Sequence, residues 1–228
     1  MDIIISGTVG VGKSTISEML YLKLKKTKQS KINLIKEIFT ENPYLDFYYQ
    51  NKEEWSFLTQ LDFLRLRFKD SFLNKDHNDI NIYDRHFLDD YVFSSLNLIK
   101  DSMASFNFMI YKKINQILLE KLNYQKNKIY FFLLVSKFEI TLNRIRERGR
   151  EIELDPKLNF YWKELYKKYY QDLQIQQYFK ENSDHFYLIN ADQSKEKVLD
   201  DILKIIEKGN IYENSYQRNN WRWEEHNG

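Results

Sequence analysis

The loop at residues 7–14, Gly-Thr-Val-Gly-Val-Gly-Lys-Ser, constrains this chain more than any other feature because it fits the pattern G-x-x-x-x-G-K-[ST]. It follows a predicted strand and opens a predicted helix, which is the context that the pattern requires. In such a loop the backbone N–H groups turn inward around phosphate oxygens, and the start of the helix adds partial positive charge. The sequence therefore predicts a phosphate-binding loop made of Gly7, Thr8, Val9, Gly10, Val11, Gly12, Lys13 and Ser14.

Two side chains of this loop have predicted individual roles. Lys13 is placed to reach the β and γ phosphates of ATP, and Ser14 is placed to ligate Mg²⁺. Three of the six glycines in the chain fall in this loop, which argues against an ordinary turn between a strand and a helix. ATP and Mg²⁺ are therefore the predicted cofactors.

Five short apolar runs, rich in β-branched or aromatic residues, alternate with longer segments of helical periodicity. The runs predict strands at 3–6, 32–35, 80–83, 129–135 and 185–190. The longer segments predict helices at about 13–26, 53–73, 86–98, 104–122, 138–148, 158–179 and 195–207. Strands that alternate with helices predict an α/β fold, in which a parallel sheet is covered by helices on both faces.

Charge and composition exclude several classes of protein. The 35 Lys and Arg residues nearly balance the 33 Asp and Glu residues, so no global excess of positive charge indicates a nucleic-acid partner. Cysteine is absent, which excludes disulfides, thiolate nucleophiles and cysteine zinc sites. No apolar segment approaches the roughly 20 residues needed to span a bilayer, and the N-terminus lacks the pattern of a secretory signal. These features predict a soluble, cytoplasmic protein without a membrane or nucleic-acid partner.

A phosphate loop is shared by GTPases, motor ATPases and small-molecule kinases, so other motifs must separate them. The chain has no N-K-x-D guanine signature, and none of its apolar runs ends in the Asp-Glu pair with which many ATPases activate water. The predicted strand at 80–83 instead leads into Asp84 and Arg85, at the carboxyl edge of the sheet. This pair suits phosphoryl transfer to a bound acceptor, and a surface ion pair is the alternative interpretation.

An arginine-rich segment follows the fourth predicted strand and its helix. Arg144 and Arg148 are four residues apart and share a helix face, whereas Gly149 breaks the helix and lets Arg150 move separately. Guanidinium groups on a mobile segment stabilise the charge of a transferring phosphoryl group, as in the lid of a kinase. A solvated, charged helix end is the alternative when the segment is considered by itself.

Two segments predict a pocket for the phosphoryl acceptor. Glu37 follows the second predicted strand, which we expect to lie next to the first, and its carboxylate can accept the proton of a hydroxyl nucleophile. In the following helix, Gln60 and Arg67 lie two turns apart on one face, among aromatic and apolar neighbours. A primary amide matches the edge of a nucleobase, although Gln60 considered alone is more often an ordinary surface residue.

In this order, these residues resemble the deoxyribonucleoside kinase family, and most closely its bacterial deoxyadenosine/deoxyguanosine kinase branch. The resemblance covers roughly residues 1–207. It rests on the phosphate loop, Glu37, E-N-P-Y-L-x-x-Y-Y from Glu41, W-S-F-x-x-Q ending at Gln60, D-R-H-F-L-D-D from Asp84, and R-I-R-E-R-G-R-E-I-E from Arg144. It implies a phosphate-loop kinase fold with a five-stranded parallel sheet, in a homodimer that transfers the γ-phosphoryl group of ATP to the 5′-hydroxyl of a deoxynucleoside. Deoxyadenosine is favoured by the branch, with deoxyguanosine and deoxycytidine behind it.

The resemblance also implies roles for individual residues. Glu37 is the base at the 5′-hydroxyl, with Asp84 as a competing candidate. Arg85 holds the region of that hydroxyl, and Asp84 supports Mg²⁺ together with Ser14. The implied contacts with the nucleoside are Tyr49 and Glu153 at the sugar 3′-hydroxyl, Gln60, Arg67 and Asp90 at the base edge, and Phe93 stacked on the ring. The implied contacts with the donor phosphates are Arg144, Arg148 and Arg150, and the loop near 190–195 is expected to flank adenine.

The sequence departs from the family at a few places. His86 stands where Ser or Thr is usual, and the spacing after Asp84 leaves Asp89 and Asp90 hard to tell apart as the base contact. Residues 1–208 predict one kinase domain with its lid at about 144–156, whereas 209–228 predict a frayed tail with two tryptophans and no family counterpart. Two alternatives stay open: a nucleoside monophosphate kinase of the thymidylate kinase type, and a kinase-like binding subunit that has lost catalysis.

Overall fold

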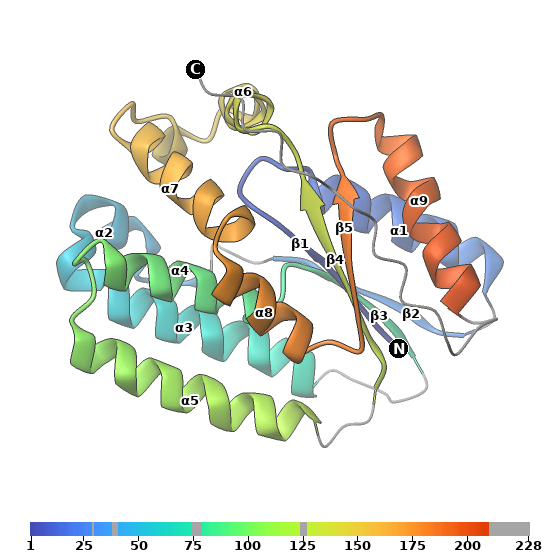
Figure 1. The fold of residues 1–228 in the computed structure, drawn as a ribbon, viewed down its shortest axis with the longest axis horizontal. Coiled ribbons are helices and arrows are strands. Elements are labelled where there is room, and N and C mark those ends of the chain that lie inside the picture. The colour runs from blue at the N-terminus through green and yellow to red at the C-terminus, as the bar shows by residue number, and fades with distance from the viewer. Residues whose placement is uncertain (29, 38–40, 74–78, 124–126, 210–228) are drawn as a thin grey trace.

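The computed structural model describes residues 1–28, 30–37, 41–73, 79–123 and 127–209. It contains a five-stranded parallel sheet in the order β2-β3-β1-β4-β5 (Figure 1). The strands are β1 Asp2–Ser6, β2 Ile32–Ile35, β3 Ile80–Asp84, β4 Ile129–Val135 and β5 His185–Asn190. The predicted α/β fold with a five-stranded parallel sheet is therefore confirmed.

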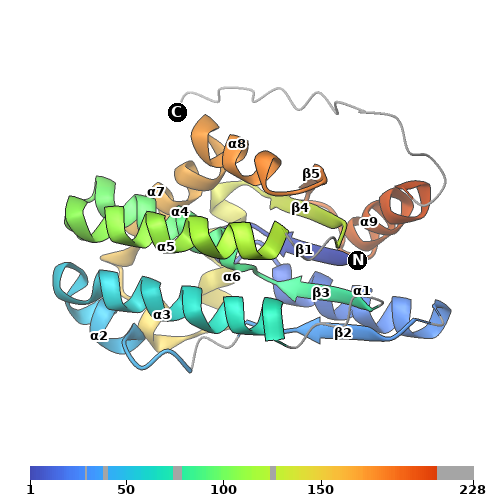
Figure 2. The same cartoon turned by 90° about the horizontal axis from the view of Figure 1, so that it is seen from below.

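Helices cover both faces of the sheet (Figures 1 and 2). Their bounds are α1 Lys13–Thr27, α2 Leu45–Gln50, α3 Lys52–Leu73, α4 Phe87–Ile99, α5 Ser105–Asn123, α6 Phe138–Arg148, α7 Leu158–Tyr170, α8 Leu173–Glu181 and α9 Lys195–Gly209. Helices α1 and α9 lie on one face, and α3, α4, α5, α7 and α8 lie on the other. Because successive side chains of a strand point to opposite faces, Ile3 and Ile5 pack in the core under α1 and α9, whereas Ile4 packs in the core under the larger helical layer.

The helix predicted at 158–179 is wrong in one respect, because the structure divides it into α7 and α8. The carboxylate of Asp172 accepts hydrogen bonds from the backbone N–H groups of Gln174, at 2.9 Å, and Ile175, at 3.2 Å. An Asp that caps a helix start in this way stabilises a new helix instead of continuing the preceding one. The short helix α2 was also not predicted.

The expected position of Glu37 next to the first strand is also wrong. Strand β2, which precedes Glu37, pairs with β3, so that β3 lies between β2 and β1. Glu37 therefore faces the end of β3, where Asp84 and Arg85 lie, instead of the end of β1. The carboxyl ends of all three strands still meet at one edge of the sheet, which is where ligands bind in open α/β folds.

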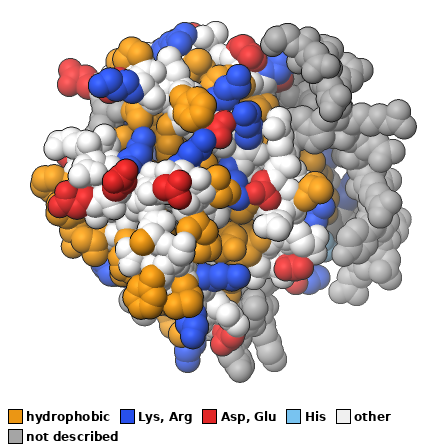
Figure 3. Space-filling view, turned by 60° about the vertical axis from the view of Figure 1, so that its left-hand side comes forward, with side chains coloured by type: hydrophobic (Ala, Val, Ile, Leu, Met, Phe, Trp, Pro, Cys, Tyr) orange, Lys and Arg blue, Asp and Glu red, His pale blue; other side chains and the backbone are white. Residues whose placement is uncertain are grey.

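The surface agrees with the balanced charge of the chain. Figure 3 shows Lys and Arg side chains interspersed with Asp and Glu on one face of the molecule. Among the described residues, no helix combines the length and the hydrophobicity that crossing a membrane requires. Of the predicted tail at 209–228, residue 209 ends α9 and residues 210–228 lie outside the described residues.

Gly10 is expected to be required by the fold of the phosphate loop. Its φ of +79° is left-handed, and a Cβ there would lie 2.4 Å from the backbone oxygen of Thr141. Strain and crowding together predict that Gly10→Ala lowers the free energy of unfolding by about 2–5 kcal/mol. Gly149→Ala is the control, because its φ is also left-handed but a Cβ meets nothing within 4 Å. Urea denaturation measures both losses, and a loss for Gly10→Ala no larger than for Gly149→Ala would contradict the steric argument.

Candidate active site

One cavity of about 760 Å³ opens at the carboxyl edge of the sheet. The predicted site residues that line it are Val9, Gly10, Val11, Gly12, Lys13, Ser14, Glu37, Tyr49, Gln60, Arg67, Asp84, Arg85, Asp90, Phe93, Arg144, Arg148, Arg150 and Glu153. Gly7 and Thr8 are the predicted site residues outside this lining, and they form the start of the phosphate loop. Residues from segments that lie far apart in the chain thus meet around one space.

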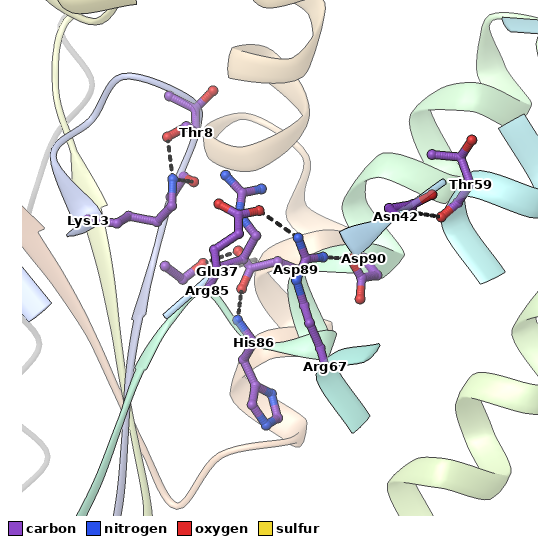
Figure 4. Close-up of polar contacts among 12 residues, drawn as sticks. Thr8, Lys13, Glu37, Asn42, Thr59, Arg67, Arg85, His86, Asp89 and Asp90 are labelled. Atoms are coloured by element: carbon purple, nitrogen blue, oxygen red, sulfur yellow. Dashed lines mark hydrogen bonds and ion pairs between the residues drawn. The ribbon is translucent and has the colours of Figure 1, made fainter. Parts of the chain in front are cut away.

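Lys13 folds back over its own loop (Figure 4). Its ammonium group donates hydrogen bonds to the carbonyl oxygens of Gly7, at 3.0 Å, and Thr8, at 2.9 Å. Burial, and then the positive charge of Arg85, lower the pKa of Lys13 to about 7, although the carboxylates of Glu37 and Asp84 oppose the shift. Among the described residues, the hydrogen bonds of this buried cation go to neutral carbonyl groups, so it is poised to gain a strong anionic partner.

Ser14 and Asp84 provide oxygen atoms that fit a magnesium ion. Burial is the main cause that raises the pKa of the Asp84 carboxyl group, and the nearby Ser14 hydroxyl opposes the shift. The Oδ1 atom of Asp84 is buried and has no hydrogen-bond partner among the described residues. Mg²⁺ prefers such oxygen ligands and takes only one or two of them from the protein when phosphates supply the others.

Arg85 is held in a strained conformation beside Glu37. Its φ of +70° is left-handed, a backbone strain that a non-glycine residue shows most often at functional sites. The Nε atom lies 3.1 Å from Glu37 Oε1, and the guanidinium lies 4.9 Å from the centre of the Phe93 ring. The fold therefore fixes a cation between the carboxylate and an aromatic ring.

Glu37 is also paired with a second arginine, as Figure 4 shows. Arg67 Nη2 lies 2.6 Å from Glu37 Oε1, and its Nη1 is paired with Asp90. Burial opposes the ionisation of Glu37, but the positive charges of Arg85 and Arg67 outweigh it and lower the pKa of Glu37 to about 2. Glu37 is therefore a fixed anion that can orient a hydroxyl group but is a weak base before substrate binds.

Gln60, Asp90 and Phe93 line the cavity together with Arg67. The side chain of Gln60 is buried, and its Oε1 atom has no hydrogen-bond partner within the described part of the chain. A buried amide oxygen without a partner indicates a missing donor, such as an amino group of a ligand.

The structure separates Asp89 from Asp90. Asp89 accepts hydrogen bonds from the Ser6 hydroxyl at 2.5 Å, the Tyr169 hydroxyl at 2.9 Å and the His86 backbone N–H at 3.0 Å. The last of these bonds belongs to a capping box at the start of α4. Asp89 is therefore fully used within the fold, and Asp90 is the one that lines the cavity.

The arginine-rich segment lies over the cavity, but its arginines contact different partners. Arg148 and Arg150 both pair with Glu153, the latter at 3.4 Å. Arg144 donates hydrogen bonds to the carbonyl oxygens of Val11, at 3.1 Å, and Ala191, at 3.2 Å. Gly149 ends α6 in a left-handed conformation, as expected for a break between Arg148 and Arg150, although both arginines contact the same carboxylate.

Sequence reasoning missed two tyrosines of the site. Tyr48 and Tyr161 line the cavity, and the Tyr48 hydroxyl lies 3.1 Å from the Tyr161 hydroxyl and 2.8 Å from Asn97 Oδ1. Burial raises the pKa of the neighbouring Tyr49 as well, so the three phenols stay neutral. Tyr161 could not be assigned to the site from the sequence, because a tyrosine in an amphipathic helix is usually interpreted as a core residue.

The start of α9 and the loop before it also line the cavity. The residues there are Ala191, Gln193, Ser194, Lys195 and Val198. The loop near 190–195 therefore lies on the cavity wall, and its expected place beside adenine stays a prediction.

Comparisons with known proteins point to one family. A model of deoxynucleoside kinases matches residues 3–207. A deoxyadenosine/deoxycytidine kinase of Bacillus subtilis is 29% identical over 209 residues, which are 90% of this chain and 92% of that protein. A deoxyguanosine kinase of Lactobacillus johnsonii is 25% identical over 225 residues, which are 95% of this chain and 97% of that protein.

Solved structures agree with the sequence relatives. The deoxyadenosine kinase from M. mycoides with bound dCTP has a TM-score of 0.73 and 29% identity, and the match covers 91% of this chain and 100% of that one. The same kinase with dCMP and dCDP has a TM-score of 0.69 and 27% identity, over 91% of this chain and 99% of that one.

Proposed function

This chain belongs to the deoxynucleoside kinase family, and from that premise we propose that deoxyadenosine is its preferred substrate, ahead of deoxyguanosine and deoxycytidine. The protein is an ATP-dependent kinase that transfers a phosphoryl group to a deoxynucleoside in nucleotide salvage. The preference among bases and the roles of individual residues are the parts that we propose.

The observation that carries the proposal is the continuity of the cavity. Lys13, Ser14, Glu37, Gln60 and Asp90 all line it. Figure 4 shows Glu37 between Lys13 on one side and Asp90 on the other. A nucleoside with its base at Gln60 would direct its 5′-hydroxyl toward Glu37 and the phosphate loop. This geometry brings the acceptor oxygen and the γ-phosphoryl group together, which is the main task in phosphoryl transfer.

Each charged group then has a defined task. The carboxylate of Glu37 orients the 5′-hydroxyl and accepts its proton as the 5′-oxygen bonds to the γ-phosphorus, while the bond from that phosphorus to the bridging oxygen breaks and ADP leaves. Arg85 keeps Glu37 ionised and in place. Lys13 stays on the carbonyl oxygens of its loop and directs its remaining N–H toward the β and γ phosphates. Ser14 and Asp84 hold Mg²⁺, which neutralises charge on the phosphates. Asp84 stays the alternative base, because its raised pKa makes it the stronger proton acceptor.

Two acceptors in the base slot support deoxyadenosine. Within the described part of the chain, the Gln60 oxygen has no donor and Asp90 is paired with Arg67, so both groups can accept from a ligand. Adenine and cytosine each present an exocyclic amino group, whereas guanine presents an oxygen at the equivalent edge. Relatives that are named for deoxyadenosine or deoxycytidine agree with this choice.

A homodimer and a cytoplasmic location stay predictions from the sequence. The frayed character of the tail at 209–228 also stays a prediction from the sequence.

Competition among the four deoxynucleosides at fixed ATP tests the proposed preference. We expect deoxyadenosine to have the highest kcat/KM, and a higher value for deoxyguanosine would reverse the assignment. A parallel assay with deoxyadenosine monophosphate tests the alternative of a monophosphate kinase. We expect no phosphorylation of the monophosphate, because Glu37 and Glu153 would repel its phosphate. Binding of nucleotide without turnover of any deoxynucleoside would support the inactive subunit instead.

ATP binding at about pH 8.5 is expected to take up nearly one proton per molecule. Lys13 is largely neutral in the free protein at that pH, since its pKa is about 7. The phosphates raise this pKa by favouring the charged form, so the uptake shrinks as the pH falls below 7, where Lys13 is already charged. Isothermal titration calorimetry in buffers of different ionisation enthalpy measures the uptake.

Matched lysine variants test the assignment of this proton. Lys13→Met should abolish the uptake, and Lys36→Met should keep it, because Lys36 is exposed and pairs with Glu18 at 3.0 Å. Uptake that persists in Lys13→Met would place the proton on another group.

A further inference from the structure

Tyr170, the last residue of α7, contacts the phosphate loop through its hydroxyl group. Its hydroxyl accepts a hydrogen bond from the backbone N–H of Thr8, at 3.1 Å, and donates one to the carbonyl oxygen of Leu134, at 2.7 Å. The pairing of β1 with β4 ends at Ser6 and Leu133, so Leu134 lies one residue beyond it. The hydroxyl therefore joins β4 to the chain at the point where β1 becomes the phosphate loop.

This contact fixes the peptide unit on which Lys13 rests. The Gly7 carbonyl and the Thr8 N–H belong to the same planar peptide group. Lys13 donates to the carbonyl, at 3.0 Å, and the N–H donates to Tyr170 on the other side. If this peptide turned over, it would present its N–H to the ammonium group. The Tyr170 hydroxyl thus sets the direction of the oxygen that holds Lys13.

The close packing around the Tyr170 hydroxyl also indicates that it sets the direction of the Gly7 carbonyl. A Cβ on Gly7 would lie 3.1 Å from the Tyr170 hydroxyl and 2.8 Å from Leu134 O, so the loop approaches both closely. The tyrosine ring itself packs in the core against Tyr166, with ring centres 4.8 Å apart. A phenylalanine would provide this packing equally well, so Tyr170→Phe keeps the ring and removes the contacts of the hydroxyl with the loop and with β4.

The preceding residue makes an analogous contact with the other cation of the site. The Tyr169 hydroxyl accepts a hydrogen bond from Arg85 Nη1, at 3.3 Å, and donates one to Asp89 Oδ1, at 2.9 Å. Asp89 is anchored in turn by Ser6 at the end of β1. Tyr169 therefore ties the guanidinium of Arg85 to the same strand end that Tyr170 braces.

We infer that Tyr169 and Tyr170 are positioning residues for phosphoryl transfer: Tyr170 orients Lys13 through the Gly7–Thr8 peptide, and Tyr169 orients Arg85. This inference rests on the roles proposed above for Lys13 and Arg85. Neither tyrosine lines the cavity, so each acts through the group that it holds. Consecutive residues of a helix point in different directions, which lets one helix end brace the ATP side and the acceptor side separately.

Two phenylalanine variants should give crossed kinetic effects. Tyr170→Phe is expected to raise the KM for ATP about tenfold, the typical result of leaving a buried N–H without its partner, with the deoxynucleoside dissociation constant unchanged. Tyr169→Phe is expected to lower kcat/KM for the deoxynucleoside about fivefold at saturating ATP, with the KM for ATP unchanged. Loss of stability alone cannot produce opposite patterns in the two variants.

Tyr178→Phe is the matched control. Its hydroxyl is also in the core and donates to Asn115 Oδ1, at 2.9 Å, but it has no contact with the loop or with Arg85. We expect it to lower the melting temperature to a similar extent and to leave both kinetic constants unchanged. Equal changes in both constants for all three variants, or normal kinetics in both Tyr169→Phe and Tyr170→Phe, would overturn the inference.

Lys13→Ala separates this inference from the proposed function. If Lys13→Ala abolishes the use of ATP while Tyr170→Phe binds ATP normally, the positioning role fails and the phosphate loop keeps its role. If Lys13→Ala uses ATP normally, the proposed role of the loop fails, and the positioning role of Tyr170 fails with it.

Discussion

Replacing Arg148 with alanine is expected to lower kcat by about 10³-fold or more, while the deoxynucleoside dissociation constant changes by less than about threefold. Arg148 lies at the end of α6 over the cavity and is paired with Glu153 in this structure. We propose that it leaves Glu153 for the γ-phosphoryl group as charge spreads over the oxygens of that group. An interaction made only in the transition state lowers kcat when it is removed and has little effect on substrate binding.

Arg146→Ala is the matched control for this prediction. Arg146 lies on the same helix, two residues earlier and nearly opposite, where it is exposed and outside the cavity lining. Its replacement removes the same charge from the same segment and should leave kcat within about twofold of the parent value. Equal loss of kcat and of nucleoside affinity in Arg148→Ala would mean that Arg148 holds the nucleoside, directly or through Glu153.

The parts of the fold that could be predicted are those with a local cause. The phosphate loop depends on glycines at fixed spacing, and the five strands depend on short apolar runs, so both are visible in the sequence. The order of the strands has no local cause. Glu37 was expected beside the first strand, but β3 lies between them, and nothing in the local pattern of either strand predicts this order.

The site shows the same division between local and long-range causes. Charged residues such as Asp84 and Arg85 are conspicuous at a strand end, and they could be assigned from the sequence. Tyr161 and Tyr170 could not, because their hydroxyls acquire a function only through partners that lie far away in the chain, such as Tyr48 and Thr8. An aromatic residue in an apolar helix is therefore ambiguous until its polar end is placed.

Replacing Glu37 with glutamine is expected to reduce the rate of phosphoryl transfer by about 10²- to 10⁴-fold, with little change in deoxynucleoside affinity. The amide keeps the shape of the carboxylate but cannot take the proton of the 5′-hydroxyl. It also leaves Arg67 and Arg85 without the anion that neutralises them both. Single-turnover kinetics with ATP measures the chemical step, and calorimetric titration measures the nucleoside affinity.

Glu18→Gln is the control for removing one carboxylate, since Glu18 is exposed, pairs with Lys36 and lies outside the cavity. It should turn over at the parent rate. A near-normal rate in Glu37→Gln would transfer the role of base to Asp84.

The two candidate bases differ in a way that the pH dependence of kcat/KM reports. Glu37 has a pKa of about 2, so it is ionised throughout the range above about pH 4, and as the base it would give no acid limb there. Asp84 has a raised pKa, so activity that depends on its ionised form would fall at a higher pH. An acid limb that belongs to the protein and survives in Glu37→Gln would therefore identify Asp84. Loss of turnover in Glu37→Gln together with a parent profile that is flat above pH 4 would identify Glu37, and its two arginines would then be the reason why the carboxylate is ready at every physiological pH.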